Sequence, residues 1–340
     1  MRAALTGATG FIGTHLTVRL VAEGIATRVL ARRPAAAAGL GRAVTGSGEP
    51  SALSVIAGDL TDDDALRELV AGCDVVFHIA GLTRAPTEAA LHDANAGGTV
   101  ALVDALDRAD APGTHLILVS SQAAVGPALD ATAIDELTPA RPISRYGRSK
   151  RAAERVVTAA ARRGRPVSII RPPSVYGPGD RDILVYFKLA SRGVVPVLRG
   201  EAPLSVLYVH NLVDALLAAA QLPPQPAQLP PQPRVLHMAD DDDVTMAQLG
   251  EMIAASLGAS PRRVVVPRPL LSAAGLLLEA WGQLSHTAPL LNRDKLHEMR
   301  QPAWLLASRR SREALRYRPR VATAAAVAAT ARWYLAHRWL

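Results

Sequence analysis

The sequence predicts an α/β fold, with a doubly wound parallel sheet followed by a smaller and less regular C-terminal region. Short apolar runs alternate with helical patterns through the first half of the 340 residues. A glycine-rich turn joins the first apolar run to the first helical pattern, and proline-rich turns replace the alternation after Arg171. Strands of a parallel sheet are buried on both faces and are joined by crossover helices, so the alternation indicates repeated βαβ units.

Six strands are expected in the first half, each a short apolar run bounded by turn residues. They lie near Arg2–Thr6, Ala26–Ala31, Leu53–Ala57, Asp74–Ala80, His115–Ser120 and Val167–Arg171. The intervening helices are expected near Ile12–Glu23, Asp62–Ala71, Glu88–Arg108 and Tyr146–Arg163. A doubly wound sheet of this kind binds its ligand beyond the carboxyl ends of its strands.

The second half is expected to cover that crevice. Residues 176–340 form mainly this second region, while residues 206–222 and 234–240 are expected to return to the first domain, residues 1–175. The tandem repeat QLPPQPA–QLPPQPR over residues 221–234 predicts an exposed polyproline II loop, because proline suits neither a helix interior nor a central strand. Asp240–Asp243 precede a helix that runs to Leu257, and we interpret them as an acidic helix start.

Composition excludes several classes of protein. The single cysteine, Cys73, forms no intrachain disulfide, and the nine histidines show no ligand spacing, so no metal site is expected. The net charge of +8 comes from arginine rather than lysine, and 4% aromatic residues are too few to stack on bases, so nucleic acid is not an expected partner. No apolar stretch is long enough to span a bilayer, and since the first residues lead directly into the glycine turn, no leader is expected. We therefore expect a cytoplasmic protein; a homodimer, and a peripheral membrane contact around Trp333 and Trp339, stay open.

The first strand runs into a turn, Thr6–Gly13, with glycines at positions 7, 10 and 13. Gly7 allows the tight turn, Gly10 lets a pyrophosphate approach the backbone, and Gly13 lets the following helix pack closely on the sheet. The amides at the helix N-terminus then face the pyrophosphate. Because this motif follows a strand, opens a helix and lies within a βαβ unit, it predicts a dinucleotide-binding domain.

The end of the second strand distinguishes the two nicotinamide cofactors. An acidic side chain there binds the ribose 2'-hydroxyl of NAD, whereas an arginine pairs with the 2'-phosphate of NADP. The chain has Leu30-Ala31-Arg32-Arg33 at this place and no acid. The sequence therefore favours NADP, with Arg32 as its partner, and leaves NAD as the alternative.

A candidate catalytic group follows in Tyr146–Lys150, where a phenol and an ammonium four residues apart share one helix face. A phenol with a pKa near 10 needs help to exchange protons at neutral pH, and a neighbouring lysine provides it. Ser120 and Ser121 end the fifth strand, where a hydroxyl can donate to the same substrate oxygen.

Several motifs occur in a fixed order along the chain. They are TGxxGxxG at Thr6–Gly13, Asp59–Leu60 after the third strand, GCDxVxHxA at Gly72–Ala80, Asn95 with Gly98–Thr99, the serine Ser121, YxxxK at Tyr146–Lys150, and RPxxVYGPGD at Arg171–Asp180. Over nearly its whole length the chain thereby resembles the extended short-chain dehydrogenase/reductase family, also called the epimerase/dehydratase family.

The resemblance implies a Rossmann fold, an NAD(P)-dependent enzyme, and the roles of several residues. Ser121, Tyr146 and Lys150 are the implied catalytic residues, and Ser121 is preferred to Ser120 because it lies five residues before Gly126. Together with the glycine turn and Arg32, the resemblance implies cofactor contacts at Gly7, Thr9, Gly10, Phe11, Ile12, Gly13, Arg32, Asp59, Leu60, Ala80, Gly81, Tyr146, Lys150, Pro173 and Ser174.

Departures from the family pattern concern the substrate. Nucleotide-sugar members have an arginine that grips the diphosphate where this chain has Ser205, and an aspartate where it has Asn211. These features look more like the 3β-hydroxysteroid dehydrogenase and dihydroflavonol reductase branch. We therefore expect an oxidoreductase that interconverts a secondary alcohol and a ketone on an apolar small molecule. The alternatives are a nucleotide-sugar epimerase or dehydratase with tightly bound NAD, and a cofactor-sensing protein without catalysis.

Overall fold

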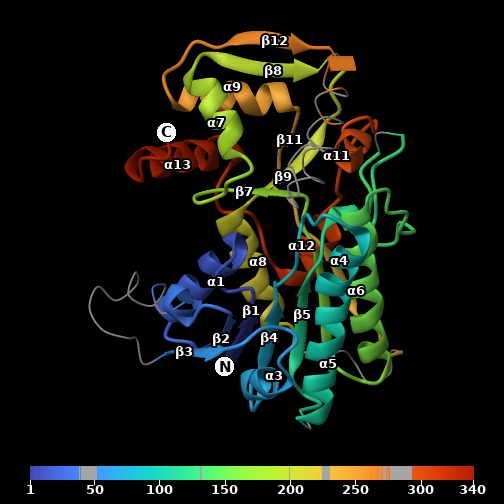
Figure 1. Cartoon of the computed structure of the whole chain (residues 1–340). Coiled ribbons are helices and arrows are strands. Elements are labelled where there is room, and N and C mark those ends of the chain that lie inside the picture. The colour runs from blue at the N-terminus through green and yellow to red at the C-terminus, as the bar shows by residue number, and fades with distance from the viewer. Residues whose placement is uncertain are drawn as a thin grey trace.

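The computed structural model describes residues 1–37, 39, 52–109, 111–130, 132–198, 200–223, 230–267, 269, 270, 273, 275 and 293–340. Its centre is a seven-stranded sheet in the order β10-β6-β5-β4-β1-β2-β3 (Figure 1). Every neighbouring pair in this sheet is parallel. The predicted doubly wound parallel sheet is therefore confirmed.

The strands of this sheet are β1 (Arg2–Thr6), β2 (Ala26–Ala31), β3 (Leu53–Ala57), β4 (Val75–His78), β5 (His115–Val119), β6 (Val167–Arg171) and β10 (Arg234–His237). The helices of its layers are α1 (Phe11–Ala22), α3 (Asp63–Val70), α4 (Glu88–His92), α5 (Gly98–Arg108), α6 (Arg145–Arg162), α8 (Val209–Ala220) and α12 (Arg309–Leu315). Four of the six predicted strands have the expected bounds, and two are one to three residues shorter.

Helices cover both faces of the sheet. On one face, Leu66 of α3, Leu102 of α5 and Val157 of α6 pack into one core. On the other face, Leu16 of α1 and Leu212 of α8 pack into a second core. Burying these apolar faces is what drives two helical layers onto one apolar sheet.

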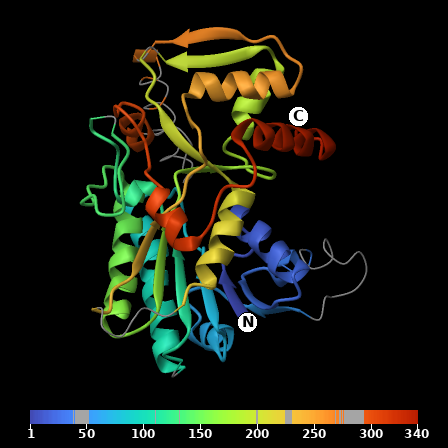
Figure 2. The ribbon, with the colours of Figure 1, turned by 180° about the vertical axis from the view of Figure 1, so that it is seen from behind.

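A smaller region lies beyond the carboxyl ends of the strands (Figures 1 and 2). It contains a three-stranded sheet of β7 (Ser174–Tyr176), β9 (Leu204–Tyr208) and β11 (Asp243–Val244), and a parallel pair of β8 (Val194–Leu198) with β12 (Arg262–Val266). Its helices are α7 (Leu184–Ser191), α9 (Met246–Ser256), α11 (Arg293–Glu298) and α13 (Thr323–Ala336). Phe187, Ile253 and Tyr334 join α7, α9 and α13 in its core.

The predicted single helix over residues 88–108 contains a π-helical segment, η1 (Asp93–Gly97), between α4 and α5. The Asn95 side chain lies within this wider turn and binds the backbone of Leu82, while the Thr99 hydroxyl donates to the Asn95 carbonyl at 2.5 Å. Such π-segments leave regular helix geometry to place a side chain, and the apolar pattern does not reveal them.

The acidic helix start predicted at Asp240–Asp243 is wrong. α9 begins after Thr245, which forms a capping box with Gln248, and its first turn has no acidic residue. Asp240 instead accepts hydrogen bonds from the Tyr208 amide and the Asn211 side chain, both at 2.8 Å, and Asp243 lies in β11. Of the repeat at residues 221–234, positions 224–229 lie outside the described residues.

Candidate functional site

The predicted site residues meet at one edge of the large sheet because all of its strands are parallel. The chain leaves β1 for β2 and β3 on one side, then crosses to β4, β5 and β6 on the other. This reversal of strand order is where doubly wound sheets open a ligand crevice. The glycine turn follows β1 at this point, and Arg32, Asp59, Ala80, Ser121 and Pro173 follow β2, β3, β4, β5 and β6.

The glycine turn has the geometry of a cradle. Gly7 has a φ of +77°, and a Cβ there would lie 2.6 Å from the Ala80 amide nitrogen. A Cβ on Gly13 would lie 2.0 Å from the Gly7 carbonyl oxygen, so the turn and α1 are in close backbone contact. α1 starts at the N-cap Gly10 without a side-chain cap, which leaves its first amides to an anion. These residues fit the pyrophosphate of a dinucleotide, with exposed Thr9 and half-buried Phe11 and Ile12 beside it.

The residues expected at the adenosine end line the same edge. Arg32 is exposed, and its charge contributes to the lowered pKa of Asp59, after the hydrogen bonds from the hydroxyl and amide of Thr61. Leu60 packs against Gly98, where a Cβ would lie 2.5 Å from the Leu60 Cδ1. On the far side of the glycine turn, Gly81 lies close to Asn95 and Lys150, Pro173 is buried, and Ser174 is exposed at the start of β7.

Ser121 and Tyr146 lie next to each other in the site. Burial raises the pKa of Tyr146 to about 12, the hydrogen bond with Ser121 lowers it, and the charge of Glu298 raises it. Ser120 is different: it is buried and donates to Glu154 Oε1 at 2.7 Å. Of the two serines, only Ser121 therefore faces the tyrosine.

Lys150 lies one turn after Tyr146 on α6 and is 4% exposed. Its Nζ donates to the Val119 carbonyl at the end of β5 at 2.7 Å. Burial lowers the pKa of Lys150 to about 8, and the charge of Glu154 opposes this shift. Beside it, burial and the charge of Lys150 lower the pKa of His78 to about 3, so His78 is neutral between Thr6 and Thr99.

Ser205, which stands where nucleotide-sugar members have an arginine, is held in hydrogen bonds within the protein. Ser205 is buried; its hydroxyl donates to Asp243 Oδ1 at 2.5 Å and accepts from the Leu306 amide at 3.0 Å. Of the nearby cations, Arg181 stacks 5.5 Å from the centre of the Trp339 ring, while Lys188 and Arg192 are exposed.

Sequence reasoning missed two features of the site. Glu298, on α11 in the C-terminal third, is close enough to act on the charge state of Tyr146. Arg84, after β4, forms an ion pair of 3.0 Å with Asp182, after β7, and so joins a loop of the large sheet to the smaller region. Neither residue belongs to a motif, and both contacts link segments far apart in sequence, so no local pattern contains them.

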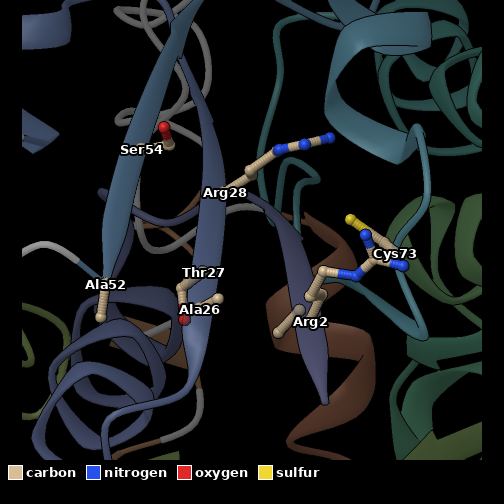
Figure 3. A pocket seen from close by; sticks show the side chains of 8 residues that line it. Arg2, Ala26, Thr27, Arg28, Ala52, Ser54 and Cys73 are labelled. Carbon is tan, nitrogen blue, oxygen red and sulfur yellow. The ribbon is translucent and has the colours of Figure 1, made fainter.

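A separate pocket of about 140 Å³ opens at the opposite edge of the sheet. Figure 3 shows Arg2, Arg28, Ser54 and Cys73 around it, near the amino ends of β1, β2 and β3. None of the predicted site residues lines this pocket, and we assign it no part in the site.

Within the described ranges, no three or more His, Cys, Asp or Glu side chains are grouped so that they could hold a metal ion. The helices of the described residues include none with the length and apolarity needed to cross a membrane.

Comparisons with known proteins show the family of the chain. Residues 3–228 match the NAD-dependent epimerase/dehydratase family. A ceramide reductase of Caulobacter vibrioides is 33% identical over 311 residues, which are 90% of this chain and 86% of the reductase. A 4-hydroxy-2-methyl-3-oxo-4-farnesyl-3,4-dihydroquinoline-1-oxide ketoreductase of Stigmatella aurantiaca is 31% identical over 229 residues, 66% of each chain.

A steroid dehydrogenase and a solved structure are also similar to the chain. A 3β-hydroxysteroid dehydrogenase/Δ5→4-isomerase of Mycobacterium tuberculosis is 32% identical over 238 residues, 66% of this chain and 61% of that protein. The structure of MoeE5 with UDP-glucuronic acid and NAD superposes with a TM-score of 0.74 over the whole of both chains at 24% identity. The chain belongs to the NAD-dependent epimerase/dehydratase family, and it is an NAD(P)-dependent oxidoreductase of the extended short-chain dehydrogenase/reductase type.

Proposed function

We propose that the protein interconverts a ketone and a secondary alcohol on a largely apolar substrate. The observation that carries this proposal is the contact of Ser121 with Tyr146 at the carboxyl edge of the sheet, beside buried Lys150. When bound, the nicotinamide supplies or accepts the hydride. These three side chains supply the proton, orient the substrate oxygen and bind the cofactor ribose.

In the reductive direction, Tyr146 Oη donates the proton to the substrate oxygen and Ser121 Oγ orients that oxygen. A raised pKa keeps Tyr146 protonated, as a general acid must be before it acts. Lys150 binds the cofactor ribose, and its ammonium lowers the cost of the tyrosinate left behind. Lys150 Nζ donates to the Val119 carbonyl and lies close to Gly81, one of the residues that would hold the cofactor.

The apolar substrate is supported by two observations. At Ser205 the chain has a buried hydroxyl in place of a cation, so the diphosphate of a nucleotide sugar would be desolvated without compensation there. The relatives named for ceramide and for a farnesyl-bearing quinoline act on molecules with long hydrocarbon parts. An apolar ligand gains about 25 cal/mol for each Å² that it buries.

We also propose a division of labour and a cofactor preference. Residues 1–175, with 206–222 and 234–240, hold the cofactor, and the rest of 176–340 mainly binds the substrate. Arg32 and the absence of an acid at Ala31 favour NADPH over NADH.

The test is a substrate panel read by NADPH consumption and by thermal shift with NADP⁺ present. We expect long-chain, sterol-like or flavonoid-like ketones to turn over and UDP-, GDP- or dTDP-sugars to have no effect. Tyr146→Phe, which keeps the ring but removes the proton, should lower kcat by at least about a hundredfold while cofactor binding persists. Saturable stabilisation by a nucleotide sugar alone would favour the epimerase or dehydratase alternative.

A further inference from the structure

The loop of residues 177–183, which joins β7 to α7, contacts two segments of the domain that contains the large sheet (Figure 1). Nε2 of His15, on α1, lies 2.8 Å from the Pro178 carbonyl oxygen, and Arg84, after β4, forms its 3.0 Å ion pair with Asp182. Pro178 is buried, whereas the Asp182 side chain is 52% exposed. Because exposed ion pairs contribute little and a partly buried hydrogen bond contributes more, His15 makes the stronger of the two contacts.

The His15 ring is a neutral hydrogen-bond donor. A carbonyl oxygen only accepts hydrogen bonds, so Nε2 carries the hydrogen that Pro178 accepts. Burial lowers the pKa of His15, the hydrogen bond to Pro178 opposes this shift, and the charge of His210 adds to it. The His210 ring packs edge-on against His15, with 4.8 Å between the ring centres. A neutral amide donor of similar length can therefore replace this imidazole.

Both contacts start from segments that carry expected cofactor contacts. His15 lies one turn after Phe11, with 5.6 Å between the ring centres, and Phe11 begins the helix whose first amides are left to an anion. Arg84 follows Gly81 by three residues, and a Cβ on Gly81 would lie 3.8 Å from Lys150 Nζ. A dinucleotide bound at the start of α1 and at Gly81 would therefore hold both residues that contact the loop.

The other end of the loop belongs to the smaller region. The loop continues into α7, where the Phe187 ring lies 5.0 Å from the Tyr334 ring of α13. The Tyr334 hydroxyl donates to the Asp180 carbonyl, and a Cβ on Gly179 would lie 3.8 Å from Trp333. The loop thus connects the cofactor segments to α7 and α13, in the region that we propose to bind the substrate.

We propose that His15 is a positioning residue, which couples cofactor binding to substrate binding through the loop of residues 177–183. When a dinucleotide occupies the start of α1, that helix holds His15, His15 holds Pro178, and the loop sets the position of α7. A ligand favours one position of a loop only through contacts that differ between positions, and the hydrogen bond from His15 is such a contact. By linkage, the substrate then strengthens cofactor binding by the same factor. This inference goes beyond the proposed function, and its first test needs no substrate.

The first experiment follows hydrogen exchange of the full chain with and without saturating NADP⁺ or NAD⁺. In the wild type we expect the nucleotide to slow exchange of residues 177–183 at least about fivefold. His15→Met, which has a similar volume and no donor, should lose this protection. His15→Gln, which keeps a neutral N–H donor, should retain much of it. The glycine turn, residues 7–13, should be protected in all three proteins, because it reports nucleotide binding itself.

Tyr334→Phe is the matched control, because it removes one hydrogen bond to the same loop from α13, a helix without an expected cofactor contact. Exchange of the loop should become faster with and without nucleotide, and the protection factor should stay. Equal loss of protection in His15→Met and Tyr334→Phe would overturn the coupling, and so would a nucleotide that protects the wild-type glycine turn but not the loop. A glycine turn that neither nucleotide protects would refute cofactor binding, and this inference with it.

A second readout separates coupling from a merely structural role. At saturating NADPH, His15→Met should raise KM for dodecan-2-one about fivefold or more and leave kcat near that of the wild type, because the catalytic residues are unchanged. A variant that is only less stable would lose kcat through its inactive fraction at unchanged KM, and that result would contradict the coupling. A wild type that reduces no ketone and binds a nucleotide sugar would overturn the proposed function, while the hydrogen-exchange result would still decide the coupling.

Discussion

Burial decides the charge of the three ionisable side chains at the reacting centre. It raises the pKa of Tyr146 to about 12, lowers that of Lys150 to about 8, and lowers that of His78 to about 3. Each shift favours the neutral form, as expected for groups removed from water. At neutral pH the site therefore holds a protonated phenol beside a lysine that is still mostly an ammonium, which suits proton donation to a carbonyl oxygen.

Arg32 is where the cofactor preference can be measured. Arg32 is exposed after β2, and the residue before it is Ala31 rather than an acid. The charge of Arg32 also helps to lower the pKa of Asp59. Arg32→Ala should weaken NADPH binding by about 1 to 3 kcal/mol and change NADH binding little, because a charge-assisted pair to the 2'-phosphate is lost. Fluorescence titration of both nucleotides measures this.

Arg33→Ala is the matched control, since Arg33 is the adjacent exposed arginine. Equal affinity of the wild type for NADPH and NADH, or an equal loss in both variants, would contradict the role of Arg32. At this scale, spacing predicted that Tyr146 and Lys150 share a helix face. It could not predict that Lys150 donates to the Val119 carbonyl, because that contact depends on how α6 packs on β5.

Among the elements, the turn between β1 and α1 is the one that the site depends on most. Gly7 and Gly24 have nearly the same positive φ, +77° and +70°. A Cβ on Gly24 would meet no atom within 4 Å, whereas one on Gly7 would lie 2.6 Å from the Ala80 amide nitrogen. Gly24→Ala should lower the free energy of unfolding by about 1 kcal/mol, the usual cost of this conformation for an L-residue.

Gly7→Ala should cost clearly more than Gly24→Ala and should also weaken cofactor binding, because the turn has to move away from the end of β4. Urea denaturation and nucleotide titration of the two variants separate the cost of a positive φ from the cost of a Cβ close to the Ala80 amide. Equal losses of stability in both variants, with unchanged cofactor affinity, would show that the close contact at Gly7 is unimportant.

The elements of the first half were predictable because apolar runs, which form the strands, alternate along the chain with amphipathic patterns, which form the helices. The bounds of β1, β2 and β6 were predicted in this way. Prediction failed where a side chain makes a tertiary contact that overrides local pattern. Asn95 lies in a π-helical segment and donates a hydrogen bond to the Leu82 carbonyl. Asp240 accepts a hydrogen bond from the amide at the start of α8 and does not cap α9. The same holds for Glu298, whose charge helps to raise the pKa of Tyr146 although its segment has no recognisable motif.

Across the whole molecule, a buried ion pair lies where a strand from the second half of the chain joins the large sheet. Arg171, at the end of β6, binds Glu154 of α6 through two hydrogen bonds of 2.7 Å, and neither side chain is more than 4% exposed. Ser120 donates to the same carboxylate, and Arg171 Nη1 lies 3.5 Å from the His237 ring of β10, which returns from the second half. The pair thus lies where α6, β5, β6 and β10 meet.

Breaking this pair should be far more costly than removing it. Arg171→Met leaves Glu154 buried with most of its compensation gone and should lower the free energy of unfolding by about 3 to 5 kcal/mol. Adding Glu154→Gln should recover part of that loss, which urea denaturation of the two single variants and the double variant measures as a coupling free energy.

Burial alone raises the pKa of Glu154, but Arg171, Ser120 and Arg151 outweigh it and lower the pKa. A carboxyl whose pKa is lowered by folding stabilises the protein above its unfolded pKa of about 4.3 and loses that contribution as the pH falls through the folded value. Between pH 7 and pH 3 the wild type should therefore lose more stability than the double variant. Parallel losses in the two proteins, or a loss below about 1 kcal/mol for Arg171→Met alone, would mean that apolar packing and not the ion pair holds α6 against β6.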